Sequence, residues 1–281
     1  MTNDLQKQLE QMVAQMPAFP ASVQKVVQLS SEGSSSAKEL VKIIEHDPIM
    51  TLKILKLLNS PYICLPRKIT SVHQSIVLLG FNTIKNMALS IATLGVLPKI
   101  NQSGFDTQNY LKHSLSTAAI ARQLNQNFAH KDFEDSDCFV AGLLHDIGKM
   151  VYAQYSPDEF AKVIGLSESE SIAVFRAERR IIGADHGLTG ALLGKKWCFP
   201  QALVDCIGHH HETEKPGNEM RDAVIAANQI SKALGCGQRI DGRDRELPKT
   251  VADRFGMDLN DLLESLGDCS AFLDYARAFA S

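Results

Sequence analysis

The sequence predicts an all-α protein, and three observations support this fold class. Apolar residues recur at the three- and four-residue spacing of helices in most segments. The strict polar–apolar alternation of half-buried strands is absent, and helix start signals repeat along the chain. With 281 residues, of which 44% are hydrophobic and 22% charged, the chain matches an average globular protein and can form a sizeable core.

The first hundred residues predict a compact bundle of short helices. Ser36 and Glu39 have the spacing of a capping box, in which each side chain bonds the backbone of the other residue. Asp47 followed by Pro48 predicts an N-cap and a first-turn proline. The remaining boundaries expected here are a helix end at Asn59, a loop over 60–68, a helix over 71–79 that ends at Gly80, and an N-cap at Asn82.

A polar segment over 99–107 predicts a boundary between an N-terminal lobe, 1–100, and a second helical lobe, 107–281. A glycine-rich and charged stretch over 235–249 is expected to form an exposed loop. The helices expected in the second lobe are 110–128, 137–155, one starting at Ser156-Pro157, 172–181, 188–197, 201–207, 221–234 and 259–278.

Composition excludes several functional classes. The net charge of −3, without a cluster of Lys and Arg, argues against direct nucleic-acid binding. Six cysteines without a Cys-x-x-Cys pair indicate reduced thiols. The longest apolar stretch, 87–97, is too short to cross a bilayer. The chain is therefore expected to be cytoplasmic and to make no membrane contact.

The chemistry-bearing residues are concentrated in the second lobe, where seven of the nine histidines lie between His113 and His211. Successive residues on a helix point about 100° apart, so His145 and Asp146 would serve one metal poorly. They would serve a pair of metals if Asp146 bridged them. Lys149, one turn later, could hold a phosphate oxygen beside those metals. Asp146 and Lys149 are therefore the candidate catalytic residues.

The order of the histidines resembles the HD superfamily of metal-dependent phosphohydrolases, including its HD-GYP branch. The spacing from Trp197 and Pro200 places the paired histidines of that pattern at His210 and His211 and makes His209 the extra one. The resemblance implies an HD-domain-like helical bundle and one or two divalent metal ions, with Fe, Mn, Zn, Ni and Mg all open. The metal ligands that it implies are His113, His145, Asp146, His186, His210, His211 and Asn228.

Three positions depart from that pattern. Asn228 stands where the family has a closing Asp, and a neutral amide binds a metal less strongly than a carboxylate. The residues after Glu212 lack the Gly-Tyr-Pro signature, so hydrolysis of cyclic dinucleotides is not expected. Asn109, one turn before His113, replaces a Glu that would support a third metal.

The first half of the chain is similar to HDOD domains. Met16-Pro17-Ala18-Phe19-Pro20 resembles their Leu-Pro-x-Leu-Pro opening, and the match continues to about residue 215. The later matching positions are Asp47-Pro48, Leu55, Leu58-Asn59-Ser60, Tyr62, Ile69, Ser71, Ser75-Ile76 and Leu79-Gly80. This resemblance implies a bacterial signal-transduction module that acts through signalling proteins or a small phosphorylated or nucleotide ligand.

Three functions stay open from the sequence. They are a regulatory or adaptor module with a partly retained metal site, an active hydrolase of phosphomonoesters or nucleotide phosphodiesters, and a metal-free scaffold with a relic pocket. Simpler roles also stay open for single residues, because Lys149 could be solvated and His113 could be a core histidine. Asp185 is expected to be an N-cap, and Glu178 a salt-bridge partner of Arg179 or Arg122 or, at most, a residue that supports a metal ligand.

Overall fold

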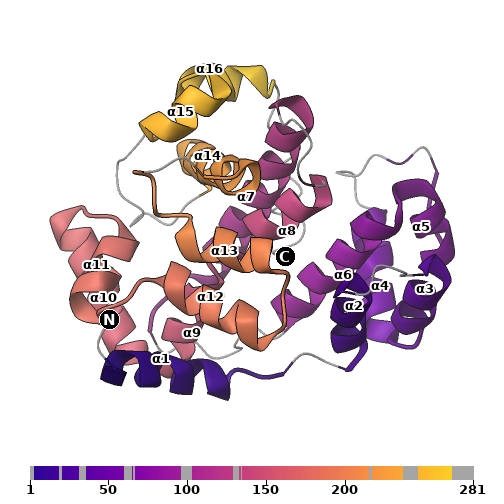
Figure 1. Ribbon diagram of the computed structural model, residues 1–281, viewed down its shortest axis with the longest axis horizontal. Helices are drawn as coiled ribbons and strands as arrows, with labels where there is room; N and C mark the ends of the chain where they lie inside the picture. Colours follow the sequence, from indigo (N-terminus) through magenta and orange to yellow (C-terminus); the bar gives the residue numbers. More distant parts are fainter. Residues whose placement is uncertain are drawn as a thin grey trace.

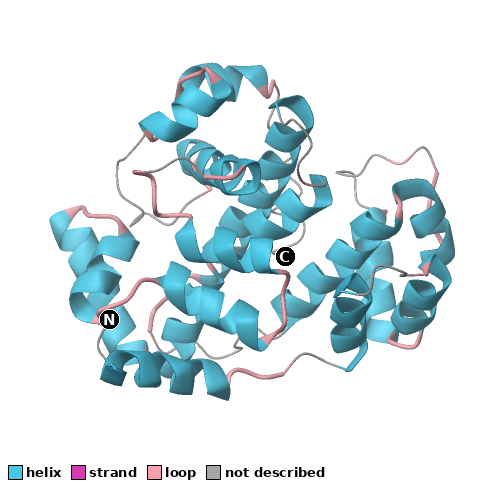
Figure 2. Cartoon of the chain, viewed as in Figure 1, coloured by secondary structure: helices cyan, strands magenta, loops and turns pink. Residues whose placement is uncertain are grey.

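The computed structural model describes residues 3–18, 21–31, 36–59, 65, 67–95, 103–128, 133, 135–214, 217–236 and 246–267. These residues form helices joined by turns and loops and contain no strand, which confirms the all-α prediction (Figure 2). The helices are α1 (Asn3–Gln15), α2 (Ala21–Ser31), α3 (Ala37–Glu45), α4 (Pro48–Leu58), α5 (Val72–Leu79), α6 (Phe81–Gly95), α7 (Thr107–Phe128), α8 (Asp135–Leu144), α9 (Ile147–Tyr155), α10 (Pro157–Glu170), α11 (Val174–Ile181), α12 (His186–Lys196), α13 (Gln201–His209), α14 (Glu219–Ala233), α15 (Lys249–Phe255) and α16 (Leu259–Ser265).

Helices α2 to α6 gather at one end of the molecule (Figure 1). Leu40, Ile44, Ile54, Leu58 and Ile84 are fully buried in their shared core. Asp47 caps α4 by accepting a hydrogen bond from the Met50 amide at 3.0 Å, as the sequence predicts. This group of helices meets the rest of the chain through α6, which packs against α8.

Helices α7, α8 and α14 pack side by side and form the centre of a second group of helices. Helices α9, α12 and α13 continue it, with α12 lying against both α9 and α13. Helix α1 packs across α9 and α12, along one edge of this group (Figure 1). Its C-terminal end is held by the Lys196 ammonium, which donates to the carbonyls of Val13, Ala14 and Met16 at 2.7–2.9 Å.

Several expected boundaries are wrong. The helix expected over 137–155 is broken, because His145 and Asp146 form a turn between α8 and α9. Ser36 is the N-cap of α3, but its side chain makes no capping bond. Asn82 lies inside α6 and does not cap it. Helix α15 begins at Lys249, the last residue of the expected loop, and the predicted segments 237–245 and 268–278 lie outside the described residues.

None of the helices in the described part of the chain combines the length and the apolar character that crossing a lipid bilayer requires.

Candidate metal centre

Four separate elements place the predicted ligands around one point. His113 lies in the middle of α7, and His145 and Asp146 occupy the turn between α8 and α9. His186 is the first residue of α12, and His210 directly follows α13. All five side chains are buried, with exposed fractions of 0–2%. The predicted convergence of these residues is therefore a feature of the fold.

Asp146 is the centre of the cluster. Its Oδ1 lies 2.9 Å from His186 Nε2, 3.4 Å from His145 Nε2 and 3.7 Å from His210 Nε2. Its Oδ2 lies 3.7 Å from His113 Nε2. Four imidazoles thus present the same ring nitrogen to one carboxylate. The turn at residues 145 and 146 makes this possible, because it frees the two side chains from the 100° separation that a helix would impose.

The other ring nitrogen of each histidine is tied to an acceptor. Because carbonyl and carboxylate oxygens can only accept, each Nδ1 carries a proton, and the neutral rings of His145 and His210 each direct an Nε2 lone pair inward. Such outer partners orient histidine ligands at metal sites. The acceptors are Cys236 O for His113 at 2.8 Å, Gly142 O for His145 at 2.7 Å, Glu178 Oε2 for His186 at 2.6 Å and Ile207 O for His210 at 2.7 Å.

The residues fit a divalent metal. Within the described part of the chain, the Nε2 atoms of His145 and His210 are buried and have no hydrogen-bond partner. Two groups of ligand atoms, each within 4.8 Å of one another, share Asp146. One contains His113 and His145, and the other contains His186, His210 and His211. Imidazoles with a shared carboxylate suit Fe, Mn, Zn or Ni.

His211 lies at the edge of the cluster and connects it to a cavity. Its Nε2 is 2.8 Å from His186 Nε2, and its ring stacks on Phe175 of α11 with a centroid distance of 4.2 Å. The neighbouring His209 points elsewhere, with its Nδ1 2.8 Å from Asp205 O, and it is exposed. The structure thus separates the extra histidine from the pair in the register that the sequence favours.

Lys149 is buried against Asp146, with Nζ 2.7 Å from Oδ2 and only 4% of the residue exposed. The interpretation of Lys149 as a solvated side chain is therefore wrong. In this structure its ammonium faces the carboxylate of Asp146. A buried ion pair of this kind keeps Asp146 charged, which a metal ligand requires.

Glu178 contacts His186, one of the predicted metal ligands, rather than Arg179. It is fully buried, and its Oε2 accepts from both the backbone amide and Nδ1 of His186, at 2.8 and 2.6 Å. The predicted salt bridge to Arg179 does not form, because Arg179 donates instead to Asp185 at 2.7 Å. Asp185 is the N-cap of α12, as expected, and accepts from the Leu188 amide at 3.0 Å.

Tyr110 was not predicted as part of the site. It is buried on α7, three residues before His113, and burial together with the charge of Asp146 raises the pKa of its hydroxyl. The helical spacing of residues 110 and 113 was the available signal, because residues three apart lie on one helix face.

The cluster divides its histidines into two protonation classes. Burial lowers the pKa of His145, His210 and His211. Burial also disfavours the charged form of His186, but Glu178 and Asp146 outweigh it and raise the pKa of His186 to about 9. Burial opposes ionisation of Asp146 as well, yet His145, Lys149 and His186 keep its pKa well below the usual value.

Metal-free protein is expected to lose stability as the pH falls below 6.5, the ordinary pKa of histidine. His145, His210 and His211 bind protons less readily when folded, so unfolding takes up protons in this range and acid favours the unfolded chain. His186 acts oppositely, because its contribution is complete below 6.5 and is lost as the pH rises through about 9. Urea unfolding between about pH 5 and about pH 9 measures both limbs.

His145→Gln should reduce the slope of the acid limb by about one proton. His209→Gln, which changes an exposed ring outside the cluster, should leave the profile unchanged. An acid limb with the same slope in His145→Gln as in the parent protein would contradict this explanation.

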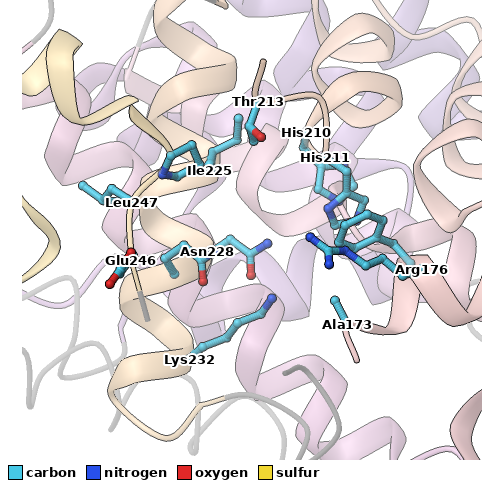
Figure 3. Close-up of a pocket in the computed structure, with 13 residues that line it drawn as sticks. Ala173, Arg176, His210, His211, Thr213, Ile225, Asn228, Lys232, Glu246 and Leu247 are labelled. Carbon is cyan, nitrogen blue, oxygen red and sulfur yellow. The ribbon is translucent and has the colours of Figure 1, made fainter. Parts of the chain in front are cut away.

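A cavity of about 630 Å³ opens beside His210 and His211 (Figure 3). Asn228 of α14 lines it, and the Oδ1 atom of this amide is buried without a hydrogen-bond partner among the described residues. Arg176 of α11 and Lys232 of α14 also line the cavity. The structure therefore places Asn228 at the wall of the cavity, beside the two histidines that follow α13.

The model of the HDOD domain family matches residues 16–213. A curated relative from Treponema pallidum, an "Uncharacterized protein", is 20% identical over 224 residues, which are 79% of this chain and 43% of that protein. Ribonuclease Y of Mycoplasma mycoides subsp. mycoides SC is 25% identical over 155 residues, 54% of this chain and 25% of that one. The chain thus spans less than half the length of these relatives.

Three solved structures share the fold over nearly the whole chain. An HDOD domain protein with unknown function from Geobacter sulfurreducens has a TM-score of 0.77, 20% identity and 97% coverage of both chains. A "Putative phosphohydrolase" from Shewanella amazonensis SB2B has a TM-score of 0.77 and 22% identity, and the match covers 97% of this chain and 98% of that one. A "Putative signal transduction protein" from Marinobacter aquaeolei VT8 has a TM-score of 0.79 and 21% identity, and the match covers 98% of this chain and 65% of that one. The chain belongs to the HDOD domain family.

Proposed function

We propose that this protein is a signal-transduction module. Its cluster of buried histidines around Asp146 binds divalent metal and, through the metal, a phosphorylated ligand. One observation carries the proposal. The Nε2 atoms of four buried histidines surround a single buried carboxylate, Asp146, while their Nδ1 atoms are held by fixed acceptors. This arrangement supplies oriented lone pairs and one negative charge at the same point.

The buried ring nitrogens without partners among the described residues favour metal binding over a relic scaffold. A buried polar atom without a partner costs about 1–3 kcal/mol, and His145 and His210 each contribute one such atom. Apolar residues could replace these histidines in a scaffold at little cost. Their retention is explained if a cation satisfies the Nε2 lone pairs.

The residues of the cluster and their neighbours have separate roles in this proposal. His113 and His145 hold one side of the site and His186, His210 and His211 the other, with Asp146 shared between them. Glu178 positions His186, and Lys149 keeps Asp146 charged. When bound, the metal supplies a positive charge that attracts phosphate oxygens and lowers the pKa of a coordinated water.

A signalling role is supported by the way the site connects to the rest of the fold. Helix α9 begins directly after Asp146, helix α12 begins at His186, and α1 packs against both. A change at the centre can therefore reach α1, which leads into the N-terminal helices. Those helices expose the large apolar side chains of Ile49, Leu52 and Val77, which suit contact with a signalling protein.

Elemental analysis of the purified protein tests metal binding. We expect one or two equivalents of a divalent transition metal in the parent protein and at least tenfold less in His145→Ala and His210→Ala after the same dialysis. His209→Ala is the matched control and should keep its metal, because His209 is exposed and lies outside the cluster. The proposal would be overturned if the parent protein took up no metal after reconstitution with Mn, Fe, Zn and Ni.

Hydrolysis of a phosphate ester is the second candidate, favoured by the cavity that reaches His210 and His211. Lys149 and Asp146 would then be the catalytic residues, and Asn228 would be a weak ligand at the cavity wall. The similarity to Ribonuclease Y supports this candidate over about half of the chain. A panel of nucleotide mono- and diesters with metal-loaded protein separates the two candidates, because the regulatory module predicts binding without turnover.

A further inference from the structure

The cavity beside the centre carries two cations that the metal site does not need. Arg176 is exposed on α11, and Lys232 is half-buried on α14. Neither side chain has an acidic partner within 4.0 Å in the described part of the chain. Arg176 is instead held over the ring of Phe175, with its guanidinium carbon 5.6 Å from the centroid. Among the described residues, no acidic side chain is paired with either of these two positive charges at the cavity.

The directions of these side chains favour a shared ligand. Lys232 and Asn228 project from one wall of the cavity and Arg176 from the other, so that their ends point toward one another (Figure 3). Residues 228 and 232 are one helical turn apart and therefore lie on the same face of α14. His210 and His211 line the same cavity, so the cations and the metal centre open into one space.

The neutral amide at position 228 matters for the charge of this wall. A carboxylate there would repel an anion between the two cations. The Asn228 amide removes that repulsion and adds a side-chain N–H donor. Of the described residues that line the cavity, Glu246 is the acidic one, and Figure 3 shows its carboxylate turned away from Arg176.

The size of the cavity indicates more than a single phosphate. Ligand pockets of about 300–1,000 Å³ typically enclose a whole small molecule, and this one has about 630 Å³. A phosphate on the metal centre would occupy only the end near His210. The remaining space contains Arg176 and Lys232, which are the side-chain types that bind phosphate by paired and point-charge contacts.

We propose that Arg176 and Lys232 bind a second phosphate group of the ligand whose first phosphate lies at the metal centre. The inference rests on the proposed function and deepens it, because it assigns the ligand class: a small molecule with two phosphate groups, of nucleoside diphosphate size. Arg176 and Lys232 are specificity residues in this assignment. They distinguish such a ligand from a monophosphate and take no part in holding the metal.

Calorimetric titration of the metal-loaded protein tests the inference with two probes, adenosine 5′-monophosphate and α,β-methylene adenosine 5′-diphosphate. The probes share base and ribose and differ by one phosphate group, and the methylene bridge prevents cleavage. The parent protein should bind the diphosphate analogue at least about tenfold more tightly. Arg176→Gln combined with Lys232→Gln should abolish that preference while keeping the metal content of the parent protein.

Arg180→Gln combined with Lys162→Gln is the matched control. It removes one arginine and one lysine from exposed positions on α11 and α10 that do not line the cavity. This control should keep the preference for the diphosphate analogue. Equal binding of the two probes by the parent protein, no binding of either, or a preference that survives in the cavity variant would overturn the inference. Loss of metal from the parent protein would instead count against the proposed function, so the two failures are distinguishable.

Discussion

Gly148→Ala is expected to destabilise the protein by at least about 3 kcal/mol and to reduce its metal content. A Cβ atom at position 148 would lie 2.0 Å from the carbonyl oxygen of His186 and 2.8 Å from the backbone nitrogen of Gly190. Both neighbours are backbone atoms of α12, so no side-chain rotation relieves the clash. Helices α9 and α12 must move apart. Because Asp146 precedes α9 and His186 begins α12, the same movement separates two central residues of the site.

Urea unfolding of the metal-free protein and elemental analysis of the purified protein measure the two effects. Gly165→Ala is the matched control, because Gly165 lies within α10 and a Cβ there would meet nothing within 4 Å. That change should stabilise the protein by about 0.5–1 kcal/mol, the usual gain from replacing a helical glycine. A Gly148→Ala protein as stable as its parent would show that the close approach of α9 and α12 is not needed.

Asp146→Asn should abolish metal binding and also destabilise the metal-free protein by about 3–5 kcal/mol. The substitution keeps the shape of the side chain but removes the one carboxylate shared by both groups of ligand atoms. It also leaves the buried ammonium of Lys149 beside a neutral amide at the position where Oδ2 accepts at 2.7 Å. Elemental analysis gives the first effect, and urea unfolding gives the second.

A second variant separates the two effects. Combining Asp146→Asn with Lys149→Met removes both buried charges, so the double variant should recover part of the lost stability and still bind no metal. Asp253→Asn, at an exposed position on α15, should change neither quantity. Retention of metal by Asp146→Asn at the level of the parent protein would refute the central role assigned to this carboxylate.

Local signals in the sequence predicted much of the fold because their physics is local. Asp47 caps α4 as predicted, and the helix predicted from residue 71 is α5, which Ser71 caps; each capping bond involves residues only three positions apart. The predicted capping box at Ser36 does not form. Its sequence spacing permits the side-chain contact without requiring it, and the Glu39 amide donates to the backbone carbonyl of Ser36 instead. Helix α1 carries no signal for where it packs. Lys196 and Tyr155, far along the chain, bind its C-terminal end.

The sequence by itself determined that the protein is helical and which histidines and aspartate belong together, because their order and spacing are those of a known family pattern. Only the tertiary structure decided how these residues act. It placed a turn at His145 and Asp146, where periodicity predicted continuous helix. It also paired Glu178 with His186 and Lys149 with Asp146 through hydrogen bonds. The reason is physical: helical periodicity reports which face of a helix is buried, whereas the partner of a buried charge depends on which other helices pack against that face.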